Sequence, residues 1–337
     1  MKKLKFSILI PTYNGQDTVR ETIQSVLSQS VSDYEIIVND DKSSDRTEKI
    51  IKNFHDRRIK FYKNGKNLGY PGNLNRCLKH ANGDIIYLLG QDDLLGTDAL
   101  KKTYEVFAGN SKIGAVTRPY RWFDEKIGTT VRIKEQLNPK KNEVINITDS
   151  PDRIVAVFKT LDSLSGLAYR RKWLDRPFHP DIFPCHIYPF ASIFKKHPVV
   201  FLKDFVIGVR IRSSQCRFLS SIYDKSPMKS WAEMFETIFY ETKYKKLRNY
   251  CIENFVAVNY VGLVQIRNYS TYQNLLREIA YLILYRKLNL ISPGFWFFSL
   301  GTLIIPPFLL IPMVDWYKNK VNSLRFRHVK FNYQALK

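Results

Sequence analysis

IIYLLGQDD, residues 85–93, places five consecutive apolar residues directly before Gly90, Gln91 and the carboxylate pair Asp92 and Asp93. An unbroken apolar run bounded by turn residues predicts a strand buried on both faces. Because open α/β sheets bind ligands just beyond the carboxyl ends of their strands, we expect Asp92 and Asp93 at a ligand-binding edge. Adjacent carboxylates repel each other unless a cation or hydrogen-bond donors compensate. The pair therefore indicates either a Mg²⁺ or Mn²⁺ site shared with a substrate diphosphate, or a solvated turn before the next helix.

Strands and helices alternate ahead of this run. Apolar strands are predicted at residues 6–10, 34–38 and 59–62, with an amphipathic helix after each. We expect Thr18 and Glu21 to form a capping box on the first helix, and Asp45 and Glu48 to cap the second. The short links between these units predict a parallel sheet with helices on both faces and right-handed crossovers. After Asp93 the pattern predicts a helix at 98–108, strands at 113–117 and 165–169, short strands within 118–147, and helices over 226–288.

The formal net charge of the 337 residues is +22. Residues 1–110 hold 17 basic and 14 acidic residues, or +3, which leaves 36 basic and 17 acidic residues, or +19, for the remainder. Such a basic half suits nucleic acid, anionic lipid or phosphorylated substrates. We expect no nucleic acid partner, since no base-stacking or groove-reading motif accompanies the charge. The four scattered cysteines predict neither a disulfide framework nor a zinc site.

Residues 290–314 contain no charged side chain and are numerous enough to span a bilayer. Four prolines interrupt them, however, and both flanks are basic, which favours a broken, re-entrant or in-plane segment on one side of an anionic membrane surface. The alternative is a buried helical pair that covers the rest of the chain or a dimer face. The N-terminal apolar run is too short for a signal peptide, so we expect the cytoplasmic face of the cell membrane, with peripheral or re-entrant attachment.

Polar residues follow the first, second and fourth predicted strands, and parallel strands bring such ends to one edge of the sheet. They are Thr12, Tyr13, Asn14, Asp40, Asp41, Gln91, Asp92 and Asp93, and the loop after the third strand adds Asn67, Asn73 and Asn75. Carboxylates can accept from a base N–H and ribose hydroxyls, amides can hold phosphate oxygens, and a metal on Asp92 can neutralise a diphosphate. Because neither G-x-G-x-x-G nor a Walker sequence is present, the set predicts a nucleoside diphosphate site rather than a dinucleotide site.

In order and spacing, SILIPTYN (7–14), DDKSSDRT (40–47), NLG (67–69), ANGD (81–84) and QDD (91–93) resemble the family 2 glycosyltransferases of GT-A fold. The resemblance is strong over residues 6–117 and weaker to about residue 212. It implies a Rossmann-like mixed α/β sheet, and an inverting transfer of a sugar from a nucleotide diphosphate sugar to a glycan or polyprenyl-linked acceptor in cell-surface polysaccharide synthesis. It also implies that Pro11, Thr12 and Tyr13 line the base pocket, that Asp40 or Asp41 reads the base, and that Asp92 contacts Mg²⁺ or Mn²⁺.

The chain departs from the family pattern at three places. Gly90 replaces the first Asp of the usual D-x-D motif, and Leu74 replaces an Arg. The family's acidic Glu-Asp motif, which supplies the catalytic base, aligns with Cys185 and His186. His186 is therefore a candidate base whose activity should fall as the pH drops through about 6–7, and the nearby Asp181 is the other candidate. The alternative for His186 is a structural, hydrogen-bonded side chain.

The resemblance divides the chain into a catalytic domain, residues 1–225, and a C-terminal helical region, residues 226–337. Within the domain, residues 1–117 would bind the nucleotide sugar and residues 118–225 the acceptor. The departures leave a second possibility open, a catalytically inactive GT-A scaffold subunit.

Overall fold

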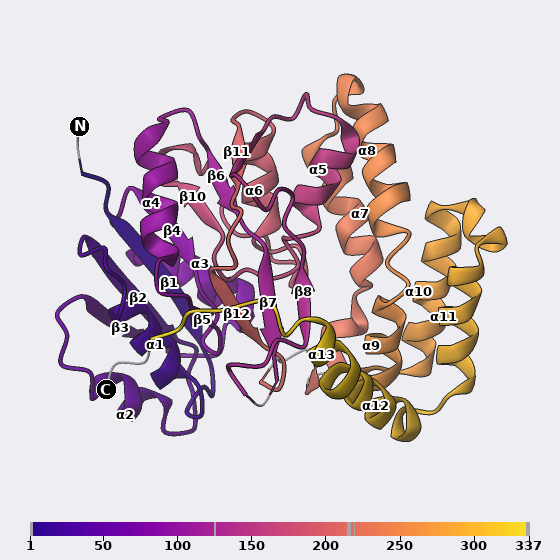
Figure 1. The fold of residues 1–337 in the computed structure, drawn as a ribbon, viewed down its shortest axis with the longest axis horizontal. Helices are drawn as coiled ribbons and strands as arrows, with labels where there is room; N and C mark the ends of the chain where they lie inside the picture. The colour runs from indigo at the N-terminus through magenta and orange to yellow at the C-terminus, as the bar shows by residue number, and fades with distance from the viewer. Residues whose placement is uncertain (1–2, 125, 214–216, 219, 335–337) are drawn as a thin grey trace.

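The computed structural model describes residues 3–124, 126–213, 217–218 and 220–334 (Figure 1). Its main sheet has eight strands in the order β3 (Ile59–Lys63), β2 (Tyr34–Asp40), β1 (Phe6–Thr12), β4 (Ile85–Leu88), β10 (Ala168–Arg170), β6 (Ala115–Thr117), β11 (Val199–Phe201) and β9 (Glu143–Ile145). β1 to β4 are parallel, as the sequence predicts, whereas β10 lies antiparallel between β4 and β6. The sheet is therefore mixed, in agreement with the resemblance.

A smaller sheet lies beside the end of β4. Its strands run in the order β5 (Leu94–Leu95), β12 (Ile207–Arg210), β7 (Tyr120–Phe123) and β8 (Arg132–Lys134). β5 begins directly after Asp93, and β12 pairs with it through Leu94 and Leu95. The carboxylate pair therefore lies at the junction between the two sheets.

Helices cover both faces of the main sheet, because successive β1 side chains point to opposite sides. Phe6, Ile8 and Ile10 pack with α1 (Val19–Leu27), α2 (Thr47–Lys52) and α4 (Ala99–Gly109), and Leu9 packs with α3 (Gly69–His80), α5 (Pro151–Phe158) and α6 (Ile187–Phe194). The predicted helix caps are mostly wrong. Among the described residues the Thr18 side chain caps nothing, and Glu48 pairs with Lys52 and Lys63 instead of capping α2. Asp45 Oδ1 does accept a hydrogen bond from Thr47 N, at 2.9 Å, at the start of α2.

The C-terminal region is helical, as predicted. It contains α7 (Pro227–Ile238), α8 (Lys245–Cys251), a π-helical turn (Ile252–Val256), α9 (Gly262–Tyr269), α10 (Tyr272–Tyr285), α11 (Pro293–Ile304), α12 (Pro307–Trp316), a second π-helical turn (Tyr317–Asn322) and α13 (Ser323–Arg325). Phe235 of α7 packs edge-on against Phe158 of α5, with ring centroids 4.7 Å apart. The helical region thus shares one core with the α3 face of the sheet; the proposed boundary at residue 225 stays a prediction.

The uncharged segment 290–314 is broken between α11 and α12, at Ile305 and Pro306, whereas Pro312 lies inside α12. Within the described ranges, no helix has both the length and the apolar character needed to cross a membrane. Phe295 and Leu310 face inward, but Phe297, Ile304 and Phe308 are each 74% exposed. The pair therefore leaves much of its apolar surface exposed.

Glu35 on β2 offers a test of this core. Its buried carboxylate lies 2.6 Å from Lys60 Nζ, Ser7 Oγ and Asn82 N. Burial by itself would raise the pKa of Glu35, but hydrogen bonds from these groups outweigh it and lower the pKa to about 2. Because the native pKa lies below the unfolded value, the carboxylate stabilises the fold above pH 4.5, and this contribution is lost as the pH falls toward 2.

Glu35→Gln should therefore lower the free energy of unfolding by about 2 kcal/mol at pH 7, and by progressively less below pH 4.5. Urea denaturation at pH 7 and pH 3 would measure this difference. Glu105→Gln, on the exposed side of α4, is the matched control and should change little. An equal deficit at both pH values would contradict the assigned role of the charge.

Candidate functional site

The carboxyl ends of β1, β2 and β4 meet at one edge, as the sequence predicts. Asp41 N donates to Thr12 O at 2.8 Å, which joins the ends of β1 and β2. The Gln91 side chain joins β4 to β1, because its Oε1 accepts from Tyr13 N at 2.8 Å and its Nε2 donates to Tyr13 O at 3.0 Å. Gln91 therefore holds the backbone of the predicted base pocket in place.

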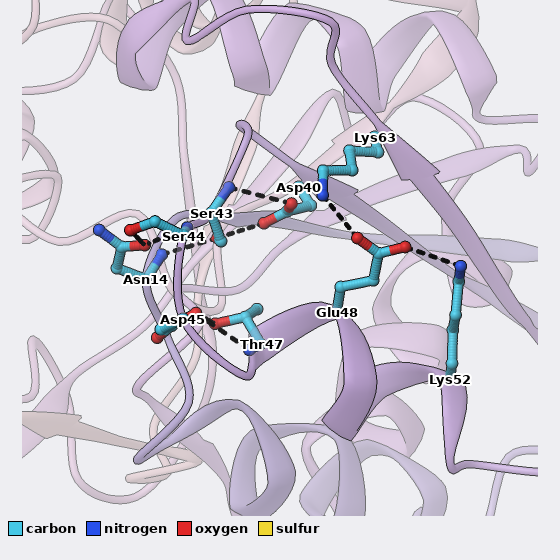
Figure 2. A network of polar contacts seen from close by, with 9 residues as sticks. All are labelled: Asn14, Asp40, Ser43, Ser44, Asp45, Thr47, Glu48, Lys52 and Lys63. Atoms are coloured by element: carbon cyan, nitrogen blue, oxygen red, sulfur yellow. Dashed lines mark hydrogen bonds and ion pairs between the residues drawn. The ribbon is translucent and has the colours of Figure 1, made fainter.

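The turns after β1 and β2 also hold each other, as Figure 2 shows. Asn14 N donates to Ser43 Oγ at 2.8 Å, and Ser44 N donates to Asn14 Oδ1 at 3.0 Å. Asn14 adopts φ 47° and Lys42 φ 64°, the left-handed region that Asn tolerates better than most residues. This interlock fixes the turn that follows Pro11, Thr12 and Tyr13.

Asp40 and Asp41 are both buried at this edge. Ser43 donates to Asp40 through its backbone N and its hydroxyl, while burial raises the pKa of Asp40. Asp41 Oδ1 accepts from Asn64 Nδ2 and from Leu68 N, each at 2.8 Å. The protein thus orients both carboxylates, and which of them reads a base stays a prediction.

The three predicted amides differ in their surroundings. Asn73 is buried and donates to Asn39 O at 3.0 Å and Thr12 O at 3.2 Å. Asn75 donates to Phe178 O and accepts from Phe178 N, at 2.8 and 2.9 Å. Only Asn67 is exposed, where its Oδ1 accepts from Gly69 N at the start of α3. Asn73 and Asn75 therefore hold backbone segments together, and Asn67 is the amide open to a ligand.

The carboxylates of Asp92 and Asp93 are held differently. Asp93 is buried, and it accepts hydrogen bonds from Ser165 Oγ at 2.5 Å and from Arg210 N at 2.9 Å. Burial and the charge of Asp92 raise the pKa of Asp93. Asp92 Oδ2 accepts from the Ser213 hydroxyl at 2.5 Å. Because both Asp93 oxygens already have protein donors, Asp92 fits a metal better than Asp93 does.

Gly90 is closely surrounded by oxygen atoms. A Cβ at this position would lie 3.1 Å from Asp92 Oδ1 and Asp93 Oδ2, and 3.3 Å from Ser165 Oγ. The first Asp of the usual D-x-D motif could not be added here without moving those groups. In the part of the chain that the structure describes, no three His, Cys, Asp or Glu residues form a metal-binding group. A bound Mg²⁺ or Mn²⁺ would thus depend on Asp92, the diphosphate and water, a ligand set that hard cations accept.

Sequence reasoning missed the residues that reach this edge from distant segments. Arg210, at the end of β12, donates from Nε to Asp92 O at 3.1 Å and forms an ion pair with Glu21. Ser165 and Ser213 hold Asp93 and Asp92 as described above. No local pattern marks these residues, because their partners lie 72 to 189 positions away.

His186 lies just before α6 and is 5% exposed. Its Nε2 lies 2.7 Å from the carbonyl oxygen of Leu161, which requires the proton on Nε2, and its Nδ1 lies 3.4 Å from the Tyr70 hydroxyl. Burial lowers the pKa of His186 to about 4. For a base in this environment, activity is therefore expected to persist below pH 6–7.

Asp181, the other candidate base, is also buried. Its Oδ2 lies 2.6 Å from Lys225 Nζ, and Lys225 also pairs with Glu233 at 3.1 Å. This ion pair must open before the carboxylate can contact an acceptor hydroxyl. His186 Nδ1 is thus the more available basic atom of the two.

Residues 7–175 match the sequence model described as "Glycosyl transferase family 2", and the chain belongs to this family. One relative is the Escherichia coli protein named UDP-Glc:alpha-D-GlcNAc-diphosphoundecaprenol beta-1,3-glucosyltransferase WfgD, 33% identical over 130 residues, which cover 34% of this chain and 51% of WfgD. Another, from Campylobacter jejuni, is named GalNAc(5)-diNAcBac-PP-undecaprenol beta-1,3-glucosyltransferase; it is 40% identical over 99 residues, 28% of this chain and 32% of the relative. The matched segment thus spans about half of WfgD and about a third of the C. jejuni relative.

Solved structures support the fold over nearly the whole chain. Residues 1–349 of S. aureus TarS in complex with UDP-GlcNAc superpose with a TM-score of 0.62 at 16% identity, covering 99% of this chain and 97% of that one. The Pyrobaculum calidifontis mannosyltransferase in complex with GDP-Man and Mn²⁺ gives a TM-score of 0.55 at 14% identity, covering 97% and 88%. At these identities the likeness establishes the GT-A-like architecture alone.

Proposed function

We propose that this protein transfers a sugar, with inversion, from a nucleotide diphosphate sugar to a glycan or polyprenyl-linked acceptor in cell-surface polysaccharide synthesis. The observation that carries the proposal is the meeting of the β1, β2 and β4 ends beside Asp92 in a chain of this family. The printed names of the E. coli and C. jejuni relatives, which include an undecaprenol diphosphate acceptor, support the lipid-linked class. UDP in the E. coli name and in the TarS complex makes UDP the first nucleotide to test.

A divalent metal fits the geometry of this site. Asp92 supplies a hard oxygen ligand at the edge where a diphosphate would lie, and the two remaining partners of the metal are the diphosphate and water. Bound there, Mg²⁺ or Mn²⁺ would stabilise the negative charge that develops on the leaving nucleoside diphosphate. Arg210, close to Asp92, adds a positive charge at the same place.

Asp92→Asn should abolish the Mn²⁺-dependent part of UDP binding, because the amide gives up the negative charge that holds the metal. Turnover of UDP-sugars should fall by about 10²–10³-fold, as when one transition-state stabiliser is removed. Calorimetry with UDP and with or without Mn²⁺ would measure the binding, and release of UDP would measure turnover.

The control is Asp98→Asn, an exposed carboxylate just before α4, which should behave as wild type. Wild-type binding and turnover by Asp92→Asn would overturn the metal assignment. A wild-type protein that binds UDP with Mn²⁺ but turns over no UDP-sugar with any lipid-linked acceptor would favour the scaffold alternative.

We infer that His186 accepts the proton of the acceptor hydroxyl through Nδ1. The Nε2–H that donates to Leu161 O fixes the ring, and the neutral form persists down to about pH 4. A pH–rate profile by itself does not identify which of His186 and Asp181 accepts the proton. Only substitution does.

His186→Ala should lower turnover by about 10²–10⁴-fold and leave UDP binding unchanged. Asp181→Asn, which also removes a buried polar contact, is the matched comparison. If Asp181→Asn gives the large loss and His186→Ala does not, the base is Asp181. If His186→Ala turns over normally, His186 is a structural side chain.

We propose that the protein attaches peripherally to the cytoplasmic face of the membrane through the outer surface of α11 and α12. Phe297, Ile304 and Phe308 on these helices are highly exposed. Exposed basic residues lie on the flanking segments: Lys287, Lys320, Arg325, Arg327 and Lys330. Apolar insertion beside basic residues is typical of in-plane binding to anionic lipid.

The double variant Phe297→Glu/Phe308→Glu should lose most of its sedimentation with vesicles that contain phosphatidylglycerol, while its melting temperature changes little because both side chains are exposed. Val144→Glu, an exposed apolar position on β9, is the control and should sediment as wild type. Equal sedimentation of the double variant and wild type would rule out this surface.

A further inference from the structure

The C-terminal tail, residues 326–334, returns from the apolar helices to the catalytic half. In Figure 1 it runs from α13 across β7, β12 and β5 and reaches α1. Along this path Thr130 Oγ1 donates to Val329 O at 3.4 Å. Thr97 then donates to Asn332 O twice, from N at 2.8 Å and from Oγ1 at 3.0 Å. Segments more than 190 positions apart are thus joined by backbone contacts.

The Phe331 ring packs into a small space between β5, β12 and β7, called its seat below, which two glycines keep open. A Cβ on Gly96, just after β5, would lie 3.2 Å from the Phe331 ring, and a Cβ on Gly208 of β12 would lie 3.3 Å from it. Contacts this short are tighter than ordinary packing, so side chains at these positions would displace the ring. The close approach of the tail to β5 and β12 therefore depends on both glycines.

Arg121 of β7 forms the third side of the seat. Its guanidinium carbon lies 4.2 Å from the centroid of the Phe331 ring, and the side chain is fully buried. Its Nε has no hydrogen-bond partner in the described part of the chain, and burial lowers the pKa of Arg121 to about 10. A desolvated guanidinium over an aromatic face is a favourable cation–π contact.

The seat lies on the two strands that adjoin the proposed nucleotide-sugar donor site, which is called the donor site below. β5 starts directly after Asp93, and β12 ends at Arg210, which contacts both Asp92 and Asp93. Tyr333, two residues beyond Phe331, comes near the ion pair of Arg210 and Glu21, and burial followed by the charge of Glu21 raises the pKa of Tyr333. The tail therefore contacts the β5–β12 pair through Phe331, and it lies beside the Arg210–Glu21 ion pair through Tyr333.

We propose that Phe331 is a positioning residue of the nucleotide-sugar site, which acts by holding the β5–β12 pair and with it Arg210 against Asp92. This inference rests on the proposed function, because it takes the Asp92 edge to be the donor site. It also links the donor site to α11 and α12, since the same tail continues from them.

The test compares UDP binding with Mn²⁺ in full-length wild type, Phe331→Ala and Phe331→Leu. Phe331→Ala should weaken UDP binding about tenfold, which corresponds to ~1.4 kcal/mol of coupling between groups in indirect contact. Phe331→Leu keeps apolar volume in the seat and should recover to within about threefold of wild type. Phe326→Ala removes the same side chain outside the seat and should bind as wild type.

An Arg210→Gln background shows whether Phe331 acts through Arg210. There Phe331→Ala should cost less than in wild type, because the group that it positions is already gone. A Phe331→Ala protein with a lower melting temperature but unchanged UDP affinity would overturn the proposal, since Phe331 would then stabilise the fold alone. Equal effects of Phe331→Ala and Phe326→Ala would overturn it as well.

Hydrogen exchange separates this inference from the proposed function. In the protein without nucleotide, Phe331→Ala should speed exchange at residues 92–95 and 207–210, whereas Phe326→Ala should not. Unchanged exchange there would overturn the positioning role. If wild type binds no UDP but the exchange still increases, the proposed function fails while the hold of Phe331 on these strands stands.

Discussion

The buried carboxyl group of Asp93 is the constraint on which the arrangement of the two sheets depends. A carboxylate removed from water is costly unless donors surround it. The two donors come from different segments: the Ser165 hydroxyl ahead of β10 and the Arg210 backbone N at the end of β12. Satisfying Asp93 therefore brings the antiparallel strand of the main sheet and the central part of the small sheet to the end of β4. Asp92 is left at the open edge, with Ser213 as its partner.

The first half of the fold was predictable because its signals are local. The apolar runs of β1, β2 and β4, and the polar residues that end them, lie next to each other in the sequence, and parallel pairing brings those ends together without further information. The antiparallel insertion of β10 beside β4 was not predictable from residues 165–169, since a short apolar run does not reveal its partner. Arg210, Ser165 and Ser213 were missed for the same reason. The hydrogen bonds of Asn75 with the Phe178 backbone were likewise not predictable, because the two residues lie 103 positions apart.

His186 shows how burial changes the effect of having a histidine where the family has an acidic residue. In water, histidine is more basic than a carboxylate by more than two pKa units, and a His in place of the family's acidic residue would shift the working pH. Burial lowers the pKa of His186 to about 4, which is the range of an ordinary carboxylate. The basicity of His186 is therefore close to that of the carboxylate it replaces. The form that accepts the proton, however, is a neutral imidazole instead of a negatively charged carboxylate. A carboxylate base becomes neutral when it takes a proton, whereas His186 would become a buried cation at the start of α6, where a helix dipole disfavours positive charge.

The apolar helices are joined to the two sheets by side-chain and backbone contacts. α12 and the turn after it are tied to the small sheet by the ion pair of Lys318 and Asp124, at 2.7 Å with both side chains nearly buried. The tail then adds Phe331 and Asn332. Each exposed apolar side chain on α11 and α12 could contribute about 1–2 kcal/mol on insertion, and each basic residue near anionic lipid about 1 kcal/mol. Energies of this size allow firm but reversible attachment. Because these ties join α12 and the tail to the small sheet, the proposed attachment would also restrict the direction in which the Asp92 edge faces. A lipid-linked acceptor confined to the same surface would then meet this edge in a restricted set of orientations.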